Sequence, residues 1–246
     1  PSDALPARNE ETTVTQLDDS AGRDTDPNPT GPRALLLYYT FSGQSVRLLD
    51  AAGEVLTARG YSVERAPIEF TDPKYARRFQ SFPLDNVWPD MLSVLPAQQR
   101  GSIGEITVPD NARDTGYDLV LIGSPTWWSD ASMPIRSFLK SPDARQLLAG
   151  TAFAVFTVCR HNWKGNYKTV RKLAEWQGGR FVGEMHATYP GNQATSMMAL
   201  TSYLGSGEYR DKYLGVPIPS TNVQDAHLEE ARAAAGRIAD QVAQRS

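Results

Sequence analysis

The chain contains one cysteine, three histidines and no long apolar run among its 246 residues. The single Cys159 cannot form an internal disulfide or build a multi-cysteine metal site. The histidines, His161, His186 and His227, have no metal-ligand spacing, so the sequence predicts no metal. No stretch approaches the roughly 20 apolar residues that span a membrane, so we expect no membrane partner.

Net charge is also low. Lys and Arg total 25 against 28 for Asp and Glu, and the net charge of −3 predicts neither a nucleic-acid partner nor a strongly acidic docking protein. With 40% hydrophobic residues, the chain is long enough for one sizeable core. The single cysteine fits a reducing compartment, and we expect a cytoplasmic protein.

Residues 1–33 differ in composition from the rest. They contain five prolines, seven acidic and three basic side chains, few apolar residues and no periodicity. This composition predicts a disordered N-terminal tail, followed by one folded domain over residues 34–246.

The most informative motif is an apolar strand that runs into a hydroxyl-rich turn, Leu37 to Ser45. Apolar residues recur at helical spacing over residues 44–59, so the turn lies at a helix N-terminus. Free N–H groups and the helix dipole favour a dianion there, and Thr40, Ser42 and Ser45 can donate hydroxyl hydrogens to phosphate. The turn is neither a dinucleotide G-x-G-x-x-G motif nor a P-loop. An ordinary helix N-cap with surplus Ser and Thr is the alternative.

Strands and helices alternate along the remaining chain. Further strands are expected at 61–68, 118–123, 151–158 and 180–188, and further helices at 132–139, with Ser132 as its cap, at about 165–177 and at about 224–243. Pro67 places the second strand at a sheet edge. The pattern predicts an α/β fold, a doubly wound five-stranded parallel sheet in the order 2-1-3-4-5 with helices on both faces. Ligands of such sheets bind beyond the carboxyl ends of the strands, where loops 40–45, 124–132 and 159–164 should converge.

Two of these loops carry a family resemblance. The spacing of hydroxyls and glycine in residues 40–45 resembles the FMN-phosphate loop of the flavodoxin family, which also lacks Lys and Arg. Residues 123–129, Gly-Ser-Pro-Thr-Trp-Trp-Ser, resemble the family's Pro-Thr-Tyr-Trp-Gly segment, which runs alongside the isoalloxazine ring. Over about residues 34–246 the chain is therefore similar to the flavodoxin-like FMN oxidoreductases. The resemblance implies an FMN site formed by Thr40, Phe41, Ser42, Gly43, Gln44, Ser45, Ser124, Pro125, Thr126, Trp127, Trp128, Cys159, Arg160, Asn162 and Trp163.

The third loop departs from the pattern of electron-carrying flavodoxins, which usually have acidic residues there. Arg160 and His161 instead place positive charge at the mouth of the expected site. A cation near flavin N1 and O2 favours the anionic reduced flavin, so we expect two-electron hydride chemistry with these two residues as catalytic candidates. Ser129 stands where the family has a glycine near flavin N5. A salt bridge from Arg160 to an acidic neighbour is the alternative, and Cys159 is expected to be a buried residue at a strand end.

A narrower resemblance rests on Cys-Arg-x-x-Trp at 159–163 and Tyr-Tyr-x-x-Ser-Gly-Gln at 38–44. Both patterns resemble flavodoxin-like proteins associated with dialkylresorcinol biosynthesis, which are linked to the oxidation of a cyclic dione to an aromatic ring. Only the flavin site is carried over from them, and not the substrate.

Residues 69–117 and 187–221 exceed what a flavodoxin-type core needs. Their aromatic and methionine content predicts packing, and we expect a substrate-pocket wall over the flavin, with a homodimer interface as the competing use. The function expected is that of an FMN-dependent oxidoreductase, which exchanges a hydride between flavin and NAD(P)H, a quinone or a small cyclic organic substrate. A flavodoxin-type single-electron carrier to a protein partner is the alternative, and a flavin-free protein with another phosphate ligand is the third interpretation.

Overall fold

The computed structural model describes residues 31–244, so most of the expected tail, residues 1–30, lies outside the described residues. Strand β1 (Arg33–Tyr38) begins at Arg33, one residue before the expected start of the folded domain at residue 34. The guanidinium group of Arg33 pairs with Glu64 and with Asp114, each at 2.9 Å. These two ion pairs tie the first residue of the strand to its neighbours in the fold.

Five parallel strands form the central sheet. They are β2 (Ser62–Pro67), β1, β5 (Leu119–Trp127), β7 (Ala152–Cys159) and β8 (Arg180–Thr188), in the spatial order β2-β1-β5-β7-β8. Counted along the chain, this is the 2-1-3-4-5 order of the flavodoxin-like doubly wound fold. The predicted fold class is therefore confirmed, including the edge position of the strand that contains Pro67.

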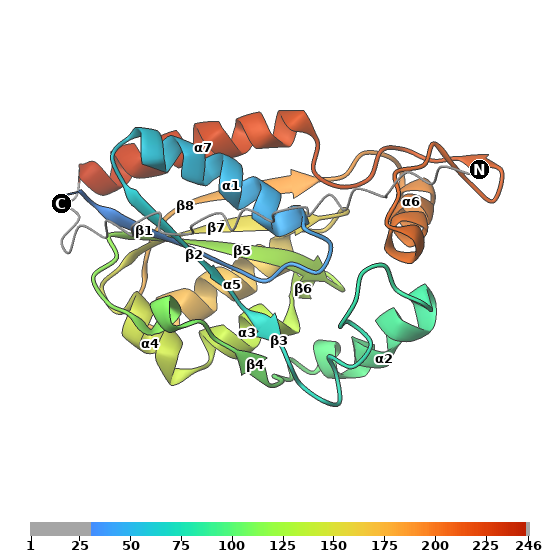
Figure 1. Cartoon of the computed structure of the whole chain (residues 1–246), viewed down its shortest axis with the longest axis horizontal. Helices are drawn as coiled ribbons and strands as arrows, with labels where there is room; N and C mark the ends of the chain where they lie inside the picture. Colours follow the sequence, from blue (N-terminus) through green and yellow to red (C-terminus); the bar gives the residue numbers. More distant parts are fainter. Residues whose placement is uncertain (1–30, 245–246) are drawn as a thin grey trace, which may run out of the picture.

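Helices cover both faces of this sheet (Figure 1). Helices α1 (Gln44–Ala58) and α7 (Asp225–Ala243) lie on one face, and α3 (Met133–Leu139), α4 (Pro142–Leu148) and α5 (Lys164–Trp176) lie on the other. Successive strand residues such as Leu35 and Leu36 enter opposite apolar clusters and are both fully buried. This two-sided burial explains the continuous apolar runs of the central strands. Within residues 31–244, no helix is both long and apolar enough to cross a membrane.

Three details differ from the sequence-based expectations. Strand β5 continues to Trp127 and pairs with a short strand β6 (Asp130–Ala131), so most of the expected loop 124–132 is a hairpin. The side chain of Ser132 makes no capping hydrogen bond to α3. The prediction missed α4, although Ser141 and Pro142 are a cap and a first-turn proline.

The two extra segments contain secondary structure of their own. The first holds β3 (Glu69–Phe70), α2 (Val87–Gln99), β4 (Ile106–Thr107) and the 3-10 helix η1 (Asp110–Arg113). The second holds α6 (Gln193–Ser206), β9 (Lys212–Tyr213) and β10 (Val216–Pro217). Helices α2 and α6 both lie beyond the end of the sheet at which its central strands finish (Figure 1).

A buried polar group holds α2 against the β5–β6 hairpin. The side chain of Gln98, 2% exposed, donates from Nε2 to the carbonyl oxygens of Trp127 at 3.0 Å and Ala131 at 2.7 Å. Its Oε1 accepts from the buried Arg136 guanidinium at 2.8 Å. All the hydrogen-bonding groups of the Gln98 amide are therefore engaged in this contact.

We predict that Gln98→Ala lowers the free energy of unfolding by about 2 to 3 kcal/mol, because it leaves buried groups without partners. Urea unfolding monitored by circular dichroism measures the change. The neighbouring Gln99 is exposed, and Gln99→Ala is the matched control, with an expected change below about 0.5 kcal/mol. Equal effects of the two substitutions would contradict the role assigned to Gln98.

Candidate functional site

A cavity of about 520 Å³ lies at the carboxyl ends of β1, β5 and β7, where the three loops were expected to converge. We call it the covered cavity, because α2 and α6 contribute to its wall. The expected site residues that line it are Thr40, Phe41, Ser42, Gln44, Ser45, Pro125, Thr126, Trp127, Trp128, Cys159, Arg160, His161 and Asn162. Its volume is in the range of small-molecule sites.

The hydroxyl-rich turn adopts the geometry of an anion-binding helix start. Gly43 precedes α1 with φ of 77°, a left-handed conformation that explains the glycine at this position. The N–H groups at the start of α1 have no carbonyl partners inside the helix. Ser45 is 2% exposed, and its Oγ has no hydrogen-bond partner among the described residues. A buried hydroxyl beside free N–H groups is suited to an oxyanion.

The side chain of Gln44 is committed to the protein itself. Its Nε2 donates to the Ser42 carbonyl oxygen at 3.1 Å and lies 3.4 Å from the Tyr203 hydroxyl. Its Oε1 accepts from the backbone N–H of Val223 at 3.0 Å. Gln44 therefore ties the turn to α6 and to the chain before α7, and its side-chain amide is not free to bind phosphate.

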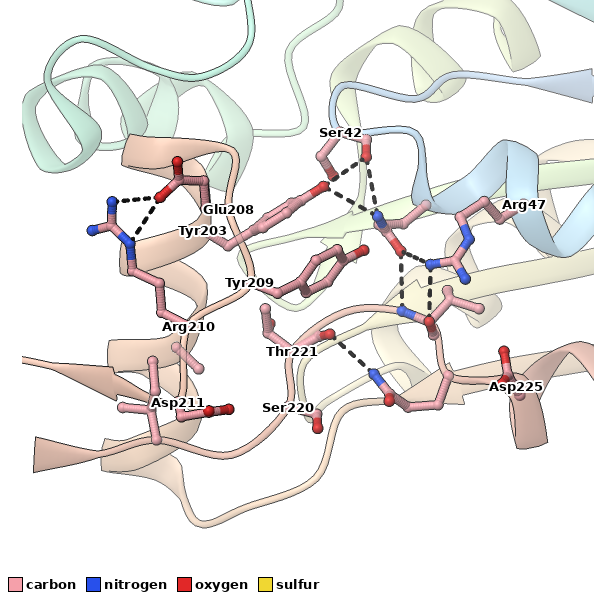
Figure 2. A pocket seen from close by; sticks show the side chains of 15 residues that line it. Ser42, Arg47, Tyr203, Glu208, Tyr209, Arg210, Asp211, Ser220, Thr221 and Asp225 are labelled. Carbon is pink, nitrogen blue, oxygen red and sulfur yellow. Dashed lines mark hydrogen bonds and ion pairs between the residues drawn. The ribbon is translucent and has the colours of Figure 1, made fainter.

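A second, more polar cavity of about 590 Å³ is lined by Ser42 and Gln44 of this turn and by residues of α6 and of the chain that follows it (Figure 2). The hydroxyl of Tyr203 reaches toward the Ser42 carbonyl oxygen, at 3.4 Å. Charged residues surround this polar cavity: Arg47, Glu208, Arg210, Asp211 and Asp225. Ser42 and Gln44 line both cavities, so the polar cavity and the covered one adjoin at this turn.

The adjacent tryptophans have different environments. The ring of Trp127 stacks on Phe79 at a centroid distance of 5.3 Å and meets Tyr39 and Phe70 edge-on at 5.8 and 6.0 Å. Trp127 lines the cavity, but most of its ring contacts are with these other aromatic side chains. Trp128 is half-buried in the cavity lining and is the tryptophan better placed to contact a ligand.

Trp128 and Ser129 form a strained hairpin turn. They have φ values of 52° and 68°, and the flanking Trp127 and Asp130 pair with each other, which is the pattern of a type I′ turn. Residues with side chains adopt this left-handed conformation at a cost of about 1–2 kcal/mol each. A Cβ at Gly165 would lie 1.9 Å from the Ser129 carbonyl oxygen, so only glycine lets α5 support the hairpin this closely.

The loop after β7 contributes one permanent charge to the cavity lining. Arg160 donates from Nη1 to the Ser196 hydroxyl at 2.8 Å and to the Gln193 side-chain and backbone oxygens at 3.2 Å, which anchors the start of α6. It forms no ion pair with any described residue, so the alternative salt bridge is not found there. His161 is exposed beside it, with Nδ1 3.2 Å from the Arg160 carbonyl oxygen.

Two uncharged groups lie deeper in the covered cavity. Burial raises the pKa of the Cys159 thiol, which also accepts from the His161 N–H at 3.3 Å. Burial raises the pKa of the Tyr189 phenol far above its usual range. Both groups are therefore protonated and neutral near neutral pH. Cys159 is a buried residue at a strand end, as expected.

Three expected site residues do not line the cavity. Gly43 shapes the turn, and Ser124 is completely buried in β5. Trp163 lies at the start of α5 and stacks on His186, with a centroid distance of 3.8 Å and an interplanar angle of 13°. The interpretation of Trp163 as a flavin contact therefore receives no support from its position, because its ring is already covered by His186.

The sequence-based list of site residues omitted the part of the wall that α2, α6 and the chain segments before them form, which we call the cover. Residues from α2, α6 and the chains before them complete the lining: Phe79, Leu84, Met91, Val94, Tyr189, Gln193, Met197, Leu200 and Leu204. In the sequence, only the surplus length and the apolar content of the two extra segments indicated that they contribute to the cavity wall. This geometry agrees with the expected pocket wall, although no periodicity identified which residues of α2 face inward.

Comparisons with known proteins identify similar structures. No protein-family model matches the chain, and no curated protein matches it. A flavoprotein from Lactobacillus acidophilus NCFM, in complex with FMN, is 19% identical, covers 63% of this chain and 93% of its own, and has a TM-score of 0.49. A flavodoxin from the domain Archaea is 12% identical, with 85% and 98% covered and a TM-score of 0.47. Oxidised flavodoxin 1 from Bacillus cereus is 11% identical, with the same coverage and a TM-score of 0.46. At this level of similarity, the assignment of a ligand depends on the chain's own residues.

The stacked pair of Trp163 and His186 yields a pH prediction. Burial lowers the pKa of His186 below 6.5, with a contribution from His227, while Glu184 and Glu230 act in the opposite direction. The unfolded chain therefore binds this proton at a higher pH than the folded chain. The free energy of unfolding should fall as the pH drops below 6.5, by less than about 1.4 kcal/mol per pH unit, and level off below the folded pKa.

His186→Gln should remove this component of the pH dependence, and Trp163→Ala should reduce it by uncovering the ring. Urea unfolding between about pH 5 and pH 8 measures it. A His186→Gln variant with the same pH dependence as the unmodified protein would show that His186 is not its source.

Proposed function

We propose that the covered cavity binds FMN and that the chain is an FMN-dependent oxidoreductase. In this proposal, the flavin exchanges a hydride with NAD(P)H, a quinone or a small cyclic organic substrate. The observation that carries it is the Ser45 hydroxyl, which is buried without a partner beside the helix N-terminus and lines the cavity. A buried hydroxyl without a partner costs about 1–3 kcal/mol, which a phosphate oxygen would offset.

The residues present fit FMN. Thr40, Ser42, Ser45 and the N–H groups at the start of α1 would hold the phosphate without a cation, since Arg47 donates instead to Gln44 and to the Val223 carbonyl oxygen. Residues 125–129 and 159–162 would flank the flavin ring, with Trp128 as an aromatic contact. The phosphate end and the ring end of the site thus come from different loops at one edge of the sheet.

Bound FMN would supply hydride chemistry, and the protein would supply orientation and electrostatics. Where the apolar side chains of α2 and α6 cover the ring, they would reduce its contact with water, which strengthens electrostatic interactions there. Arg160 places a positive charge at the cavity wall, where it would stabilise negative charge on the reduced ring. Cys159 is a neutral thiol, so no covalent step is assigned to it.

The cover supports this proposal over a single-electron carrier. A carrier passes electrons to a protein partner at an accessible flavin edge, whereas here two added helices contribute to the cavity wall. The narrower resemblance to proteins of dialkylresorcinol biosynthesis agrees with an organic substrate. No substrate is taken from that resemblance.

We predict that Ser45→Ala weakens FMN binding by about tenfold, the equivalent of one hydrogen bond of about 1.4 kcal/mol, without lowering the stability of the FMN-free protein. The second half of this prediction follows because the hydroxyl has no partner to lose. Quenching of FMN fluorescence and urea unfolding measure the two quantities. Thr57→Ala, which removes an exposed hydroxyl from the same helix, is the matched control and should change neither. Unchanged FMN affinity in Ser45→Ala would contradict the phosphate site.

Anaerobic titration of the FMN-reconstituted, desalted protein tests the reaction class. We expect the visible flavin bands to survive desalting and then to bleach in one two-electron step with NADPH, NADH or a reduced organic donor. Accumulation of one-electron-reduced flavin would favour the carrier. Loss of flavin on desalting would contradict the FMN site itself.

A further inference from the structure

The inner wall of the cover is apolar apart from Gln193 at the start of α6. Helix α2 contributes Met91 and Val94, and α6 contributes Met197, Leu200 and Leu204. Among the described residues, no carboxylate and no lysine lines the covered cavity. Gln98, which anchors α2, and Ser196, which binds Arg160, are absent from that lining.

The interior therefore offers few counter-charges to a ligand. Cys159 and Tyr189 are neutral, and Arg160, the one permanent charge of the described lining, is fixed to the first turn of α6. Removing an unpaired charge from water costs several kcal/mol. The desolvation cost of an anionic group under α2 and α6 would be offset only if that group reached Arg160.

The neighbouring polar cavity has the opposite character. Arg47, Arg210, Asp211 and Asp225 lie around it (Figure 2), and it adjoins the covered cavity at Ser42 and Gln44, which line both. The polar cavity therefore offers charged partners to a charged ligand, and the covered cavity offers apolar contact area to an apolar ligand. This difference between adjacent cavities indicates what the covered one accepts.

We infer that the substrate taken under α2 and α6 is an uncharged, largely apolar ring compound, and that Met91 and Met197 are its specificity-determining contacts. The inference rests on the proposed function, because the cavity must also hold the flavin. Methionine is unbranched and adaptable, so a pair of methionines can close on flat rings of differing outline. A dinucleotide, with its charged pyrophosphate, would be confined to the mouth at Arg160 and His161.

A matched pair of quinones tests the charge preference. The FMN-reconstituted full chain is reduced anaerobically and mixed with menadione or with a naphthoquinone that carries one sulfonate group. The quinone takes a hydride from the reduced flavin and a second proton from solvent and leaves as the hydroquinone, and the flavin returns to its oxidised form. The concentration dependence of flavin reoxidation gives a Kd for each compound, independent of their different limiting rates. We expect menadione to bind at least about tenfold more tightly than the sulfonate.

A matched pair of variants tests the location. Met197→Glu places a carboxylate in the cover, whereas Met198→Glu changes the adjacent, equally half-buried methionine, which lines neither cavity. Met197→Glu should weaken menadione binding about tenfold or more and Met198→Glu less than about twofold, while both retain FMN. Met197→Gln, with a similar length and no charge, should show a smaller effect in the same direction and replaces Met197→Glu if that variant does not fold.

The outcomes separate the two proposals. If the sulfonate binds as tightly as menadione, or Met197→Glu leaves menadione binding unchanged, the inference is overturned and the FMN proposal stands. If Met197→Glu loses FMN itself, the cover contacts the cofactor and the inference is again wrong. If the unmodified protein does not retain FMN on desalting, the proposed function fails, and the inference that rests on it fails with it.

Discussion

Burial of the parallel sheet on both faces is the constraint on which the rest of this structure depends. With α1 and α7 on one face and α3, α4 and α5 on the other, the central strands have no face left for a ligand. Backbone groups within the strands are paired with neighbouring strands, so unpaired N–H groups occur where a strand passes into a helix. The turn before α1 is such a place, and the other two loops meet it because parallel strands end at the same edge.

The two extra segments add the feature that most distinguishes this protein. Helices α2 and α6 come from distant parts of the chain, yet both lie against this edge, and polar contacts hold each of them. Gln98 and Arg136 fix α2 to the β5–β6 hairpin, and Arg160 fixes α6 to the loop after β7. The inner surface of the cover is largely apolar, with Gln193 as the polar residue that α6 contributes to it.

The site therefore combines two kinds of electrostatics within one fold. At one end, backbone N–H groups and hydroxyls offer partial positive charge to a dianion without a lysine or arginine. At the other end, Cys159 and Tyr189 are neutral and the cover is largely apolar, which leaves Arg160 as the one permanent charge of the described lining. Such an arrangement suits a cofactor with an anionic tail and a flat ring better than it suits a charged substrate.

The sequence by itself determined the alternation of strands and helices, the order of the sheet, and the three loops at its edge. These features follow from local periodicity and turn chemistry, which neighbouring residues carry; β8, for example, has the bounds that were expected. Tertiary structure decided the direction of each side chain. Trp127 and Trp163 have partners in Phe79 and His186, and the amide of Gln44 is bound by Val223, so none is as free as its position in the motif suggests. The cover was also decided at this level, because the docking of α2 and α6 depends on contacts such as Arg160 with Ser196, between residues that no local pattern relates.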